Sequence, residues 1–250
     1  MPFIFPWIGL GGGFTNEIVL VVPLIFIGPC TIVGVIGLLV CEYRKWSVAR
    51  GMFKTFTAGT FLAVVIFGYA LRDGNSASWA CLLAGLCLGF VGDVLLIGKS
   101  QRALLLGLGS FLLGHLAYLA AFYSLGIDWT NVGIAAVALT AVGIPVARFL
   151  LPHAPAELRR PIIAYQVVIS SMVAAAWGIA GVHDGGGLFF AAAATAFYIS
   201  DLSVGLERFV SDRFIHRVWG IPLYFGAQFT TALATVALIH DAHLSKIFGL

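Results

Sequence analysis

Two carboxylates stand inside apolar stretches of membrane-spanning length. Asp93 lies in WACLLAGLCLGFVGDVLLI (79–97), and Asp201 lies in LFFAAAATAFYISDLSVGL (188–206). A charged side chain in such a stretch is costly, and it is kept where it faces a bundle interior or a wet cavity, usually for function. The other acidic residues fall in loops or at the ends of apolar runs. Asp93 and Asp201 are therefore the predicted catalytic residues.

One histidine lies deep in an apolar stretch, in FLLGHLAYLAAFY. His115 and Tyr118 stand three residues apart, so they share a face of a predicted helix. His115 can orient a carboxylate or shuttle a proton. A structural histidine, hydrogen-bonded across helices, explains the residue equally well.

Three tyrosines and one glutamine complete the predicted substrate-binding or orienting set. Tyr224 and Gln228 share a helical face, and Tyr198 precedes Asp201 by one turn. Tyr165 is explained equally well as an interfacial aromatic residue. Gln228 is the more informative member, because an amide in the middle of a membrane span needs a hydrogen-bond partner.

The composition indicates what must position these side chains. The chain is 60% hydrophobic and 10% charged, whereas soluble domains carry about 25% charged residues. Continuous apolar runs exclude a membrane β-barrel, whose strands alternate. We predict an all-α membrane protein, with residues 1–250 forming a single transmembrane domain. A span needs about 20 apolar residues, and the eight predicted spans are 18–41, 53–71, 79–97, 103–125, 132–151, 162–182, 188–206 and 218–239.

The basic residues predict the orientation of the bundle. All Lys and Arg except Arg72 and Lys246 fall in or beside the loops after spans one, three, five and seven. These loops are therefore predicted to be cytoplasmic, with both termini on the other side. Asp93 and Asp201 then lie roughly 6–8 Å inside the cytoplasmic boundary, at about 1.5 Å per residue. We expect a multi-pass protein of a bacterial inner membrane, with its site in the cytoplasmic half.

The cytoplasmic cations around this site have two interpretations. Lys54 and Arg217 can hold a lipid phosphate or can simply set topology, and topology is the favoured interpretation.

Small and cyclic residues add three expectations about the helices. Gly85, Gly89 and Gly92 form a small face that favours close helix packing beside Asp93. Pro29 and Pro222 lie inside predicted spans, where each can kink its helix or free a carbonyl near the cavity. Pro161 is expected in a first helical turn, which accepts proline.

Other classes of chemistry are disfavoured by the sequence. One deep histidine and two acids do not provide the ligands of a zinc hydrolase, so no metal is expected. No GxSxG motif indicates a serine nucleophile. No basic block resembles a nucleic-acid surface. We expect no cofactor and no nucleic-acid partner.

Five ordered motifs resemble the YhhN family of integral membrane proteins, whose animal relatives include lysoplasmalogenases. They are GFVGDVLL, FLLGHLAY, AYQVVISSM, FYISDLSVGLERF and YFGAQFTTAL, and the resemblance covers about Lys54 to Leu233. It implies eight membrane helices and hydrolysis of the vinyl ether bond of lysoplasmalogens, with membrane lipids as partners. The family's motif aspartates fall on Asp93 and Asp201, its GH..Y motif on His115 and Tyr118, and its late Tyr/Gln pair on Tyr224 and Gln228.

The implied reaction suits two carboxylates. Vinyl ethers hydrolyse through protonation on carbon and an oxocarbenium ion, which resembles the transition state of glycoside hydrolysis. One of Asp93 and Asp201 would donate the proton and the other would stabilise the cation and activate water; the sequence does not assign the roles. Two alternatives stay open: a small proton-coupled transporter, and a lipid-binding membrane protein without turnover.

Overall fold

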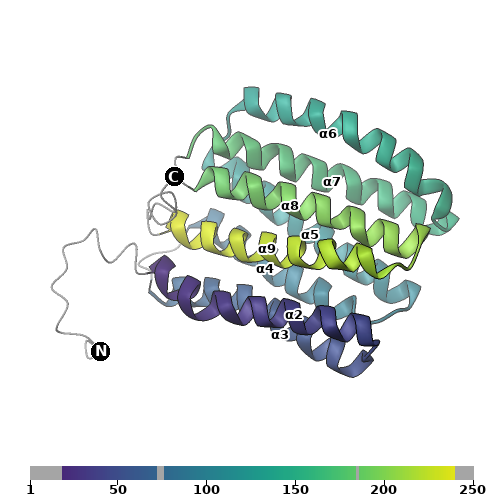
Figure 1. The fold of residues 1–250 in the computed structure, drawn as a ribbon. Helices are drawn as coiled ribbons and strands as arrows, with labels where there is room; N and C mark the ends of the chain where they lie inside the picture. Colours follow the sequence, from purple (N-terminus) through teal and green to yellow (C-terminus); the bar gives the residue numbers. More distant parts are fainter. Residues whose placement is uncertain (1–18, 72–75, 184–185, 240–250) are drawn as a thin grey trace.

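The computed structural model describes residues 19–71, 76–183 and 186–239, and both chain termini lie outside this part (Figure 1). Within these ranges the chain is helical and contains no strand. Eight of the described helices are long and apolar enough to cross a membrane. The predicted fold class is confirmed, whereas the side on which the termini lie stays a prediction.

The helices follow the predicted spans closely. The first span joins the π-helical turn η1 (Pro23–Ile27) to α2 (Gly28–Arg44). The remaining spans are α3 (Ser47–Ala70), α4 (Ala77–Leu95), α5 (Gln101–Leu125), α6 (Trp129–Leu150), α7 (Ala156–Ala180), α8 (Gly187–Gly205) and α9 (Phe214–Ile239). A 3-10 turn η2 (Leu151–His153) follows α6, and a π-helical turn η3 (Leu206–Val210) follows α8.

Short, capped connections make consecutive helices antiparallel. The side chains of Ser76, Ser100 and Asp128 accept hydrogen bonds from backbone N–H groups at the starts of α4, α5 and α6. Lys45 ends α2 in the left-handed conformation, with φ of 58°. The last turns of α2, α4, α6 and α8 therefore gather at one end of the bundle with the first turns of α3, α5, α7 and α9 (Figure 1).

The predicted glycine face brings α4 close to its neighbours. A Cβ on Gly85 would overlap the ring of Tyr118, and one on Gly92 would lie 2.7 Å from the ring of Phe111, both on α5. A Cβ on Gly89 would lie 2.5 Å from Nε2 of Gln228 on α9. Because α4 also contacts α3, it sits among three helices, whereas α6 lies at the outer edge of the bundle beside α7 (Figure 1).

The prolines differ partly from expectation. The prediction for Pro161 was wrong, because α7 begins at Ala156 and holds Pro161 inside it. Pro155 occupies the N-cap position of α7 without a side-chain capping hydrogen bond, and the helix begins at Ala156, before the apolar run. Pro29 follows the π-helical turn η1. A π-helical turn is wider than an α-helical one, and it stands where the missing N–H of the proline interrupts the α-helical hydrogen bonds. Pro222 lies inside α9 between cavity-lining residues, so the carbonyl of Val218 loses its usual partner there.

Candidate active site

A cavity of about 300 Å³ lies at the gathered end of the bundle, and all eight long helices contribute to its lining. Leucine, isoleucine, valine and phenylalanine side chains form most of its wall. The charged residues of the lining are Glu42, Arg50, Lys54, Asp93, Asp201, Glu207, Arg208 and Arg217. Acids, cations and an apolar wall therefore share one space.

Asp93 is held by two donors from different helices. Tyr224 Oη on α9 donates to Asp93 Oδ2 at 2.6 Å, and Lys54 Nζ on α3 lies 3.4 Å from Asp93 Oδ1. Gln228 Nε2 donates to Tyr224 Oη at 3.1 Å and so positions the tyrosine. The side chain of Asp93 is only 2% exposed. Both carboxylate oxygens of Asp93 are therefore engaged.

Asp201 has a different set of partners. Tyr165 Oη on α7 donates to Asp201 Oδ2 at 2.6 Å, and His115 Nε2 lies 3.1 Å from the same tyrosine oxygen. Among the described residues, no Lys or Arg lies within ion-pair distance of Asp201, and Oδ1 makes no hydrogen bond. His115 thus reaches the carboxylate through Tyr165.

The direction of these hydrogen bonds fixes the tautomer of His115. The Tyr165 hydroxyl donates its only proton to Asp201, so its oxygen can only accept a hydrogen bond from His115. His115 must therefore carry a proton on Nε2. Nδ1 is buried and has no hydrogen-bond partner in the described part of the chain. A buried imidazole without a charged partner is neutral, so His115 acts as a neutral donor that positions Tyr165.

The remaining predicted residues divide between the cavity and the packing behind it. Tyr198 lines the cavity, and its hydroxyl accepts from Gln166 Nε2, which lines it too. Tyr118 does not line the cavity: its ring packs against Gly85, and its hydroxyl is buried without a partner among the described residues. His115 and Gln228 likewise lie behind the tyrosines that they contact.

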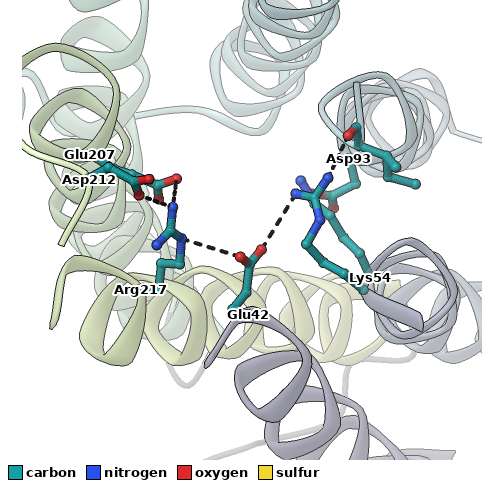
Figure 2. A network of polar contacts seen from close by, with 8 residues as sticks. Glu42, Lys54, Asp93, Glu207, Asp212 and Arg217 are labelled. Atoms are coloured by element: carbon teal, nitrogen blue, oxygen red, sulfur yellow. Dashed lines mark hydrogen bonds and ion pairs between the residues drawn. The ribbon is translucent and has the colours of Figure 1, made fainter. Parts of the chain in front are cut away.

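Arg217 joins three segments at one side of the cavity. It pairs with Glu42 of α2 at 3.4 Å, with Glu207 of η3 at 2.6 Å, and with Asp212. Glu42 also pairs with Arg50 of α3 at 3.5 Å. Figure 2 shows Glu42 between Arg217 and the Lys54–Asp93 pair. A hydrogen bond from Arg217 and its positive charge lower the pKa of the exposed Asp212 carboxyl.

Sequence reasoning missed several of these contacts. The acids Glu42 and Glu207 looked like ordinary helix-end residues, and the ion pair of Lys54 with Asp93 was not anticipated. Gln166 was not singled out, although it adjoins Tyr165. An acid at the end of one span, followed by basic residues at the start of the next, is the signal that could have indicated the Glu42–Arg50 pair.

No described group of three or more His, Cys, Asp or Glu side chains is arranged to hold a metal ion. The cavity lining offers carboxyl, phenol, amide, ammonium and guanidinium groups.

Comparisons with known proteins identify the family of the chain. The model of the YhhN family matches residues 49–235, a range that includes the cavity-lining part of every helix except α2. Lysoplasmalogenase TMEM86B of the mouse, Mus musculus, is 28% identical over 177 residues, which cover 70% of this chain and 71% of the mouse protein. No solved structure matches significantly. Since the family model covers well over half of its length, the chain belongs to the YhhN family.

Proposed function

We propose that the protein is an intramembrane hydrolase that cleaves the vinyl ether bond of lysoplasmalogens. The products are a fatty aldehyde and glycerophosphoethanolamine or glycerophosphocholine. The observation that carries the proposal is the placement of Asp93 and Asp201 on one largely apolar cavity, each hydrogen-bonded to its own tyrosine. The name of the mouse relative supports the choice of substrate.

The two carboxyl groups suffice for the reaction. One carboxyl group is protonated and transfers its proton to the outer carbon of the C=C bond, the one farther from the ether oxygen. The π electrons form the new C–H bond, and the inner carbon and the ether oxygen share the positive charge of an oxocarbenium ion. The other, ionised, stabilises the cation and takes a proton from water as the water oxygen bonds to the inner carbon. The hemiacetal then collapses: its C–O bond to glycerol breaks, the glycerol oxygen takes the proton from the second acid, and the hydroxyl proton returns to the first.

The cavity suits a single-chain phospholipid. Ligand sites are usually about 300–1,000 Å³ and mostly apolar with a few polar groups, and this cavity, at about 300 Å³, is at the small end. It accommodates the glycerol and the vinyl ether, while the remaining alkyl chain extends into the membrane. Arg208 lines the cavity, is half-buried and makes no ion pair or hydrogen bond within the described ranges. Its guanidinium is the cation best placed to bind the phosphate.

Replacing Arg208 by glutamine is therefore expected to raise KM for a lysoplasmalogen about 10-fold with little change in kcat. The phosphate contact is present in both the ground state and the transition state, so its loss weakens binding uniformly. Arg102→Gln, an exposed cation outside the cavity, is the matched control and should leave both constants unchanged. An equal loss of kcat and kcat/KM in Arg208→Gln would contradict a binding role.

We place the cavity in the cytoplasmic half of a multi-pass membrane protein, and we treat residues 1–250 as one domain. The positions of Lys and Arg support this orientation, because the loops at the cavity end of the bundle carry nearly all of them.

A turnover assay on the purified protein in detergent tests the function. Lysoplasmenyl-ethanolamine and -choline should each release aldehyde, whereas the saturated alkyl ether and the acyl lysophospholipid should not react, because neither has a C=C bond joined to an ether oxygen. No aldehyde from a folded protein would refute the hydrolase. Proton-gradient-dependent uptake into vesicles would then favour a transporter, and binding without uptake a lipid-binding protein.

A further inference from the structure

We propose that Lys54 assigns the two aspartates their separate roles: Asp93 works as the ionised carboxylate and Asp201 as the proton donor. The inference rests on the proposed hydrolysis and deepens it. Lys54 is a positioning residue here, since it acts through Asp93.

The hydrogen bonds around Asp93 favour an ionised carboxylate in the resting site, while each oxygen keeps a lone pair that can accept a proton from water during the reaction. Lys54 faces Oδ1 and Tyr224 faces Oδ2. Both partners are donors, so both oxygens of Asp93 act as acceptors. The ammonium group lies 3.4 Å away, and opposite charges at such a distance favour the ionised form.

Asp201 lacks both features. Tyr165 occupies Oδ2, while Oδ1 has no partner among the described residues and can carry a proton toward the cavity. Burial without a cation favours the neutral carboxyl group. After the proton has left, the hydrogen bond from Tyr165 stabilises the new carboxylate, and the neutral His115 holds Tyr165 in place.

The other charged and titratable groups around each carboxyl group do not reverse this asymmetry. On the helices packed around Asp93 they are Lys54 and Arg50 of α3, His115 and Tyr118 of α5, and Tyr224 and Arg217 of α9. Around Asp201 they are Tyr165 of α7 with His115 of α5 behind it, and, in the same cavity lining, Tyr198 of α8, Glu207 and Arg208 of η3, and Tyr224 and Arg217 of α9. Arg217 forms ion pairs with three carboxylates, and Arg50 contacts Glu42 and the Ile97 carbonyl. Arg208 shares the cavity lining with Asp201 but forms no ion pair with it.

In the balanced reaction, Asp201 gives its proton to carbon and becomes a carboxylate beside Tyr165. Asp93 remains ionised while the oxocarbenium ion exists, then takes a proton from the attacking water and passes it to the glycerol oxygen. The hydroxyl proton of the hemiacetal transfers to the Asp201 carboxylate, so both carboxyl groups return to their starting protonation states.

Infrared spectroscopy of the purified protein near neutral pH tests the assignment without needing turnover. A protonated-carboxyl C=O band is expected in the native protein and in Asp93→Asn, and it should be absent from Asp201→Asn. Lys54→Met should add a second such band, whereas Lys54→Arg and the exposed-residue control Lys99→Met should not. Absence of the band from the native protein, or its loss in Asp93→Asn instead, would overturn the proposal.

The pH dependence of kcat/KM gives a second readout. The acidic limb reports protonation of Asp93, so Lys54→Met should move that limb upward by about one to three pH units. Lys54→Arg should restore it, and Lys99→Met should leave it in place. Movement of the basic limb alone would make Asp93 the proton donor and contradict the assignment. A native chain that shows the expected bands but releases no aldehyde would refute the hydrolase and not the charge assignment.

Discussion

Asp201→Asn and Asp93→Asn are each expected to lower kcat for lysoplasmenyl-ethanolamine by about 10³-fold or more. General acid–base catalysis contributes roughly 10²–10⁴-fold, and each substitution removes one of its two participants. Asparagine has nearly the same size and can still accept the hydrogen bond from Tyr165 or Tyr224. The loss is therefore expected in kcat, as measured by aldehyde release, with the fold intact.

A matched control separates the loss of a catalytic group from the mere loss of a negative charge. Glu157→Gln removes an exposed carboxylate in the first turn of α7, outside the cavity, and should keep native turnover. If either aspartate variant, shown to be folded by its thermal unfolding, turned over substrate at a rate near that of Glu157→Gln, that aspartate would not be a catalytic residue.

Gly220→Ala is expected to destabilise the bundle by about 1–3 kcal/mol, the usual cost of overpacking. A Cβ at this position of α9 would overlap Oγ of Ser203 and lie 2.5 Å from its Cβ. Ser203 lies on α8 and is buried. Rotating the hydroxyl does not move Cβ, so the two helices must separate, and the cavity between their ends would widen.

The thermal unfolding of the detergent-solubilised protein measures this cost. Gly226→Ala is the matched control, because it lies on the same helix and a Cβ there meets nothing within 4 Å. It should be neutral or slightly stabilising, since alanine is the better helix former. Equal midpoints for the two variants would show that α8 and α9 do not pack as closely as described.

The sequence predicts the helices well because membrane spans are dictated by length and apolarity. Runs near 20 residues, separated by charged loops, correspond to all eight described spans. Asp93 and Asp201 stand out for the same reason, since an acid in such a run is rare. Their matching depths also indicate a shared cavity, and the structure has both in one lining.

The pairing of side chains was much less predictable. Lys54 at the start of a span satisfies the positive-inside rule whether or not it pairs with Asp93, so its role needs the tertiary structure. The spacing of His115 and Tyr118 places them on one helical face, but it does not say which neighbour each meets. The structure joins His115 to Tyr165, whereas Tyr118 packs behind the cavity against Gly85.

The most direct test of carbon protonation by an enzyme carboxyl group is turnover of lysoplasmenyl-ethanolamine in D₂O. The aldehyde would be trapped as it forms and analysed by mass spectrometry, with Asp201→Asn as the control for uncatalysed hydrolysis. One solvent deuterium is expected on the carbon next to the carbonyl, in amounts that depend on Asp201. Enzyme-dependent aldehyde without deuterium at that carbon would contradict protonation on carbon.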